Sequence, residues 1–264
     1  MRPGFLLVTV TAAIAFVAGC GSSSSAGSSS TSASTTTISP NSHNGIETRS
    51  GAQIVAAAVA ATKQQSSFHF VETAGEGSNG VVVVGDVGTS SGEQHVTIRE
   101  GKKNGHVTLI LSGKTAFFQG DALGLEGFTG LSAKLSTQYA DKWISVPSSN
   151  TSFSTIAGTL EVGTAATQFV KLPGTLTRGE TSTQSGHAAV AVNAAEKTST
   201  GSLTLTIYVA TMGEALPILV AGTTTATGTG SRSISAKFSG WGEPLHVITP
   251  STSVPIAEVQ ALAG

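Results

Sequence analysis

The feature that most constrains this fold is a series of short runs in which apolar and polar residues alternate. Residues 203–209 (LTLTIYV) and 231–238 (SRSISAKF) are clear cases, and residues 107–111 and 187–192 are similar. Successive side chains of a β-strand point to opposite faces, so a period of two predicts strands with one apolar face. Gly-containing stretches such as residues 112–114 separate the runs and predict tight turns. The pattern therefore predicts an antiparallel sheet.

Two parts of the chain show helical spacing instead. Residues 50–65 (SGAQIVAAAVAATKQQ) place apolar residues on one helical face, and the serine that opens this stretch can cap the helix. Residues 120–142 have apolar residues at mixed helical spacing, and residues 151–171 are weakly helical with interruptions at Gly158 and Gly163. One helix, several strands, a helical insert and more strands predict an α+β fold, in which helices cover one face of an antiparallel sheet.

The N-terminus predicts export and lipidation. Arg2 precedes an apolar run at residues 5–16, and Val17-Ala18-Gly19-Cys20 has the small-small-Cys ending of a lipobox. The run is too short to span about 30 Å of hydrocarbon, so residues 1–19 are expected to be a lipoprotein signal peptide. Cys20 would become the acylated, palmitate-bearing first residue and anchor the protein on the extracytoplasmic face of the cell membrane. The alternatives are an ordinary signal with a chance cysteine, or a short membrane anchor.

The composition after the signal predicts a tether and one domain. Residues 20–45 contain the acylated cysteine and an uncharged Ser/Thr/Gly stretch, which cannot bury enough apolar surface to become ordered. Residues 46–264 are long enough for a single domain with a sizeable core. Charged residues make up only 11% of the chain, with 14 basic and 15 acidic residues. No basic patch indicates a nucleic-acid partner.

The motifs that could carry catalysis are weak. Residues 88–92 (GTSSG) match G-x-S-x-G, but a strand follows them rather than a helix, so a hairpin loop is favoured. The 6 histidines never stand at H-x-x-x-H or H-E-x-x-H spacing. His95 and His106 could meet across a hairpin, but no carboxylate cluster accompanies them. We therefore expect no enzyme, no cofactor and no metal site.

A group of motifs, taken in order, resembles the LppX/LprAFG lipoproteins of actinobacteria, which are similar in fold to the lipoprotein carrier LolA. The motifs are LSGKTAF at 111–117, KWISVP at 142–147, SGHAAV at 185–190, LTIYVA with a following Leu-Pro at 205–217, and FSGWGEP at 238–244. The resemblance covers about residues 50–250. It implies a curved antiparallel β-sheet, a half-barrel, with helices packed on its concave face and an apolar cavity between them.

This resemblance implies that the protein binds lipid acyl chains in the cavity and helps to transport membrane lipids or acylated glycolipids outward across the cell envelope. An envelope transporter is a candidate partner. The Thr- and Gly-rich segment 151–171 departs from the family pattern, which leaves the cavity mouth and the lipid open. The residues expected to line the cavity are Val107, Leu109, Leu111, Phe117, Leu205, Ile207, Val209, Ile234 and Phe238.

For each of these residues a filled core is the alternative to a cavity wall. Two other functions also stay open. The same fold could serve as a protein-binding or sensor module, as in the RseB-type stress sensors. The chain could also be a structural surface lipoprotein with a closed core.

Overall fold

The computed structural model describes residues 42–199, 201–226 and 230–263. The expected signal peptide, Cys20 and most of the tether therefore lie outside the described residues. Asn44 fixes the start of the described chain to the sheet, because its side-chain amide donates to the carbonyls of Ala210 (3.0 Å) and Gly213 (3.1 Å). No helix within these ranges combines the length and the apolar character that crossing a membrane requires.

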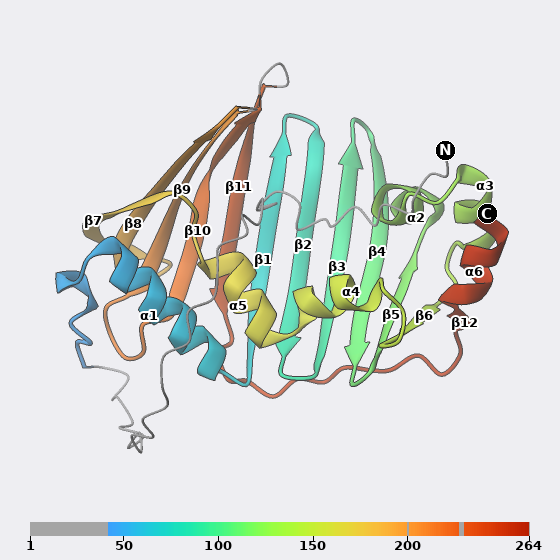
Figure 1. The fold of residues 1–264 in the computed structure, drawn as a ribbon, viewed down its shortest axis with the longest axis horizontal. Helices are drawn as coiled ribbons and strands as arrows, with labels where there is room; N and C mark the ends of the chain where they lie inside the picture. The colour runs from blue at the N-terminus through green and yellow to red at the C-terminus, as the bar shows by residue number, and fades with distance from the viewer. Residues whose placement is uncertain (1–41, 200, 227–229, 264) are drawn as a thin grey trace, which may run out of the picture.

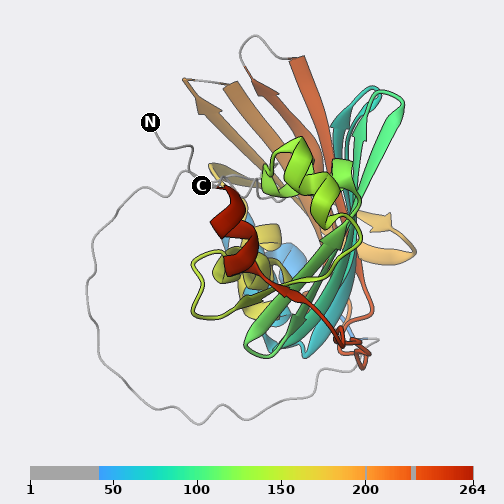
Figure 2. The same ribbon diagram turned by 90° about the vertical axis from the view of Figure 1, so that its right-hand side faces the viewer.

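The strands form one 12-stranded sheet in the order β12-β6-β5-β4-β3-β2-β1-β11-β10-β9-β8-β7 (Figure 1). Neighbouring strands are antiparallel, except that β12 is parallel to β6. The edge strands β12 and β7 do not pair with each other, so the sheet is open, and it curves around the helices (Figure 2). The strands are β1 (Ser67–Glu76), β2 (Asn79–Gly88), β3 (Ser91–Glu100), β4 (Lys103–Ser112), β5 (Thr115–Gly120), β6 (Ile144–Pro147), β7 (Thr175–Gln184), β8 (His187–Thr198), β9 (Gly201–Ala210), β10 (Pro217–Ala226), β11 (Gly230–Ser239) and β12 (Val254–Pro255).

The helices of the described chain lie on the concave side of this sheet (Figure 2). Helices α1, α5 and α4 cross the face of the sheet, while α2, α3 and α6 gather near β4, β5 and β6 (Figure 1). The α+β prediction, a curved sheet with helices on its concave face, is therefore confirmed. The helices are α1 (Gly51–Gln64), α2 (Ala122–Thr129), α3 (Ala133–Tyr139), α4 (Phe153–Leu160), α5 (Val162–Val170) and α6 (Ile256–Ala263), and a 3-10 turn (Ile46–Thr48) precedes α1.

Helix α1 begins where the sequence predicts. The Ser50 side chain accepts a hydrogen bond from the Gln53 backbone N–H, and the Gln53 side chain accepts one from the Ser50 N–H. This reciprocal pair satisfies backbone donors that the first turn of a helix leaves free. The buried face of the helix includes Ile54, Val55 and Ala58, and the helix packs against α5 and β7.

The helical segment at residues 151–171 breaks at a different place from the one predicted. Gly158 and Gly163 both lie inside helices, and the break falls at Glu161, whose backbone is extended (φ −106°, ψ 127°). Glu161 also forms an isolated parallel bridge with Gly88 at the end of β2. The break therefore follows a backbone contact with the sheet, which the local sequence does not encode.

Residues 103–105 (KNG) have the composition of a hairpin turn, and the sequence predicts the turn there, but the hairpin between β3 and β4 turns earlier. The turn lies at Gly101, which has φ 61°, and Lys102, whereas Gly105 pairs with Ile98 inside the sheet. Gly105 is needed for another reason, because a Cβ there would lie 2.6 Å from the backbone nitrogen of Gly124 in α2. The glycine thus permits a close approach of helix and strand rather than a turn.

The chain after β11 crosses the outer, convex face of the sheet. The Thr249 hydroxyl donates to the Ser112 hydroxyl at 3.0 Å, and the Val254 N–H donates to the Trp143 carbonyl at 2.8 Å. The chain then returns to the concave side as α6, which packs against α3 and β6. The sequence pattern predicts neither β12 nor α6.

Candidate functional site

Apolar side chains form rows across the concave face, because directly paired residues of neighbouring strands share a face. A central row runs from β8 to β4 and is almost entirely aliphatic, and each of its members is buried. Its members, in spatial order, are Val192, Ile207, Val220, Ala236, Glu72, Val83, Val96 and Val107. The concave face is therefore a broad apolar surface with one carboxyl group near its middle.

Aromatic side chains join the helices to the row beside this one. The Phe169 ring of α5 lies 4.8 Å from the Phe70 ring and 6.1 Å from the Phe238 ring, measured between centroids. The Phe128 ring of α2 lies 6.4 Å from the Phe118 ring of β5. These separations are typical of packed aromatic pairs. The helices thus lie directly against this row of the sheet.

The structure places most of the predicted cavity-lining residues on the concave face. They lie on the three strands β4, β9 and β11, and all of them are buried; Leu205, Ile207 and Val209 have no exposed surface (0%). Their lining role stays a prediction, because most of them also pack into one hydrophobic core with residues of the helices. The residues on this face are Val107, Leu109, Leu111, Leu205, Ile207, Val209, Ile234 and Phe238.

Phe117 is the exception among these predictions. Leu109 and Leu111 pair with Phe118 and Ala116, so those residues share the concave face. Phe117 lies between Ala116 and Phe118 in the same strand, and alternation turns its side chain to the outer face. The structure therefore removes Phe117 from the set of residues that could line a space between sheet and helices.

The helices cover only part of the apolar face. In Figure 1, α1, α5 and α4 cross the half of the strands nearer the lower edge of the view, and no helix of the described chain covers the upper part of β11, β1 and β2. Side-chain burial decreases in that direction at some positions: Phe70 and Val83 are buried, whereas Ala74, Val81 and Leu203 are half-buried. Ile234, which pairs with Ala74, is still buried. The apolar face therefore continues beyond the layer of helices.

Glu72 is the site residue that the sequence prediction missed. It lies in the central row between Ala236 and Val83, and its side chain is 4% exposed. Burial raises the pKa of its carboxyl group from 4.5 to about 7. Its position could have been predicted, because Phe68, Phe70 and Glu72 alternate along one strand and must share a face.

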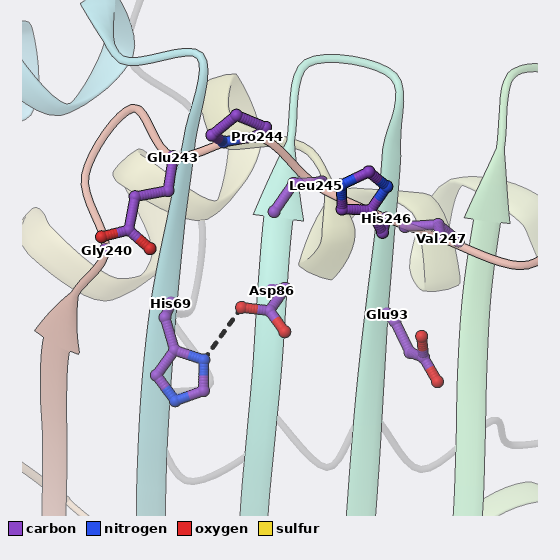
Figure 3. Close-up of a pocket in the computed structure, with 9 residues that line it drawn as sticks. All are labelled: His69, Asp86, Glu93, Gly240, Glu243, Pro244, Leu245, His246 and Val247. Atoms are coloured by element: carbon purple, nitrogen blue, oxygen red, sulfur yellow. Dashed lines mark hydrogen bonds and ion pairs between the residues drawn. The ribbon is translucent and has the colours of Figure 1, made fainter.

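A second, polar site lies on the opposite face of the sheet. A hollow of about 250 Å³ separates the outer side of β1, β2 and β3 from the chain between Gly240 and Val247. Figure 3 shows His69, Asp86 and Glu93 along its sheet side, and His69 Nδ1 lies 2.9 Å from an Asp86 carboxylate oxygen. Its lining includes no serine, threonine or cysteine, so the His–Asp pair is not part of a nucleophilic triad here.

The structure also shows where the other candidate catalytic and metal-binding motifs lie. The G-x-S-x-G stretch is the tight connection between β2, which ends at Gly88, and β3, which begins at Ser91. His95 and His106 do not meet, because His95 lies beside Thr108 (3.2 Å) and His106 beside Thr97 (3.4 Å). Within the described ranges, no group of three or more His, Cys, Asp or Glu side chains could hold a metal ion.

Fold and site together define a class: an α+β protein with an open, curved sheet whose apolar concave face carries the helices. No protein-family model and no curated protein sequence matches the chain. Among solved structures, it is similar to LprF from Mycobacterium bovis, with 14% identity over 76% of this chain and 96% of that one, and a TM-score of 0.49. The lipoprotein LppX from Mycobacterium tuberculosis matches with 16% identity over 75% of this chain and 99% of that one, and a TM-score of 0.47. The names LprF and LppX both belong to the group that the sequence motifs resemble.

Proposed function

We propose that this protein is a membrane-anchored, extracytoplasmic lipoprotein that binds lipid acyl chains between the concave face and the helices and helps to carry lipids outward across the cell envelope. It acts as a binding protein and not as an enzyme. The observation that carries this proposal is the apolar face itself, which continues past the helices into half-buried positions such as Ala74, Val81 and Leu203. An aliphatic surface with few polar groups suits acyl chains.

The energetics of such a site suit a carrier. Apolar burial contributes roughly 25 cal/mol per Å² relative to water. An acyl chain that moves from a bilayer to the protein exchanges one apolar environment for another, so the transfer free energy is close to zero. A lipid can then enter and leave without a covalent step, while its polar head group stays at the mouth of the site.

The anchor belongs to the same proposal. Residues 1–19 serve as the signal peptide, and Cys20 receives the acyl chains that hold the protein to the outer face of the cytoplasmic membrane. Each buried methylene contributes about 0.8 kcal/mol, so two or three chains form a durable anchor. Residues 20–45 then link the anchor to a single domain, 46–264, and an envelope transporter would load or unload the lipid.

A second candidate function rests on a specific observation. Several predicted lining residues, among them Leu205, Ile207 and Val209, have no exposed surface and belong to the hydrophobic core. A structural lipoprotein with a filled interior would have such a core. The two candidates differ in whether the interior can open to admit a ligand.

A transfer assay separates them. A pyrene-labelled diacyl lipid is placed in donor vesicles, and its appearance in acceptor vesicles is followed with and without the full chain. We expect transfer that rises with protein concentration, and a several-fold loss with Leu109→Trp, which enlarges a concave-face side chain. Phe117→Trp is the matched control, because that residue is also buried but lies on the outer face. Transfer that is unaffected by the wild-type chain would favour the structural lipoprotein.

A further inference from the structure

The residues that flank Glu72 on the concave face of the sheet are apolar. Its directly paired neighbours are Val83 on β2 and Ala236 on β11, and Phe70 precedes it on the same face of β1. Helices α4 and α5, which contact the sheet beside β1, contain no titratable side chain at all. The carboxyl group therefore lies in an environment that offers it no charge of opposite sign.

The charged side chains that share the concave face lie farther along the strands. Glu76 is two positions beyond Ala74 on β1 and is exposed, with its carboxylate beside Gly230. Arg232 lies near the start of β11 and is also exposed. No hydrogen bond or ion pair joins the Glu72 carboxyl group to any side chain or backbone group of the described chain, and burial alone accounts for its altered acidity.

A carboxyl group that is largely buried and has no protein partner is uncommon, because burial removes most of its contact with water and no hydrogen bond replaces it. Burial beside Glu72 differs between its two neighbouring strands. On β2, Val83 is buried and Val81, one step farther along the same face, is half-buried, whereas on β11 both Ala236 and Ile234 are buried. A ligand that enters along the β2 side of the apolar face would therefore meet the carboxyl group at the boundary between half-buried and buried positions.

We propose that Glu72 is the hydrogen-bonding anchor for an uncharged, hydroxyl-bearing lipid on the concave face. This inference rests on the proposed lipid-binding function and adds the class of lipid. A carboxyl group accepts a hydrogen bond from a hydroxyl in both its protonated and its ionised form. A phosphate or carboxylate head group is disfavoured at this position, because two negative charges would face each other in an apolar environment. Glu72 thereby selects lipids by the polar group nearest their acyl chains.

The test is a competition between two lipids that differ in one hydroxyl group. The full chain, extracted in detergent, is mixed with equal amounts of 1,2-dioleoylglycerol and its 3-acetyl ester, re-isolated, and analysed for bound lipid by mass spectrometry. The wild type should retain the alcohol over the ester by about tenfold, because a site built to bind a hydroxyl discriminates against an analogue that lacks it. Dioleoylphosphatidic acid, offered in the same way at pH 8, should be retained least.

Variants assign the preference to Glu72. Glu72→Leu should bind both lipids about equally while keeping the total amount of bound lipid, and Glu72→Gln should accept phosphatidic acid more readily than the wild type does. Glu76→Leu is the matched control on the same face and should leave the preference unchanged. Far-UV circular dichroism and the urea midpoint of each variant report on folding.

The outcomes that overturn the inference are distinct from failure of the proposed function. If the wild type binds both neutral lipids without preference, or if Glu72→Leu keeps the full preference, Glu72 is not the anchor although lipid binding stands. If neither the wild type nor any variant retains lipid, the proposed lipid-binding function fails, and this inference fails with it.

Discussion

Glu72 gives the fold a pH dependence that a purely aliphatic row would not have. Its ordinary pKa of 4.5 applies to the unfolded chain, and burial raises the pKa to about 7 in the folded protein. Between these two values the folded protein holds a proton that the unfolded chain has released. The free energy of unfolding therefore falls as the pH rises through this window.

The corresponding prediction concerns Glu72→Gln. The shift of the wild-type pKa from 4.5 to about 7 corresponds to a loss of about 3 kcal/mol of stability between pH 4 and pH 8. Glu72→Gln should not show this loss, because its amide does not titrate. Between pH 4 and pH 8 the free energy of unfolding of the variant should therefore fall by about 3 kcal/mol less than that of the wild type. Urea unfolding at a series of pH values measures the difference.

Glu76→Gln serves as the comparison, because Glu76 is exposed on the same strand. It should follow the wild-type curve over the whole pH range. A Glu72→Gln curve that also runs parallel to the wild type would show that Glu72 is not buried in its protonated form.

At the scale of elements, the contact between α2 and β4 depends on glycine. A Cβ on Gly124 would lie 2.2 Å from the His106 carbonyl oxygen, a distance that no relaxed structure tolerates. The same contact is supported by Asp121, whose carboxylate caps α2 through the Gly124 N–H (2.6 Å) and also accepts from the His106 N–H (3.0 Å). One acidic side chain and one glycine thus fix where the helix meets the sheet.

A pair of glycine substitutions tests this account. Gly124→Ala must push α2 away from β4 and should lower the free energy of unfolding by about 1–3 kcal/mol, in the range of overpacked sites. Gly163→Ala in α5 meets no atom within 4 Å and should raise it by roughly 0.5–1 kcal/mol through helix propensity. Thermal or urea unfolding measures both. Equal effects of the two substitutions would contradict the close contact.

Elements with a strong periodic pattern could be predicted from the sequence, and elements fixed by distant contacts could not. The alternation at residues 203–209 predicts β9 and its buried face, and Ser50 predicts the start of α1. The adjacent pair Phe117 and Phe118 is ambiguous, because either ring could face the core until pairing with β4 decides. Helix α6 was missed because its place depends on packing against α3 and β6.

At the scale of the whole molecule, the proposed carrier is a folded domain that a tether links to the membrane. The composition of residues 21–41 predicts a flexible link that would reach roughly 25 Å from the membrane anchor, whereas Asn44 is already bound to the sheet. Within that radius the concave face could turn toward the bilayer to load a lipid and away from it to deliver one. Loss of the anchor should therefore change the location of the protein without changing its fold.

Cys20→Ala tests the anchor. The variant should no longer incorporate a labelled fatty acid, and its retention in the membrane fraction should fall, because the acyl chains are the expected anchor. Ser25→Ala, a change within the expected tether, should leave both properties as they are in the wild type. Unchanged acyl labelling of Cys20→Ala would remove the lipobox assignment.

The central claim of the proposed function is that acyl chains bind on the concave face of the sheet. Native mass spectrometry of the full chain, purified from an actinobacterial host and followed by organic extraction, tests it most directly. We expect an adduct of defined mass, present at about one per protein, that extracts as lipid and carries a free hydroxyl group. A bare protein mass that stays unchanged after incubation with host lipid extract would contradict it and favour a lipoprotein with a closed core.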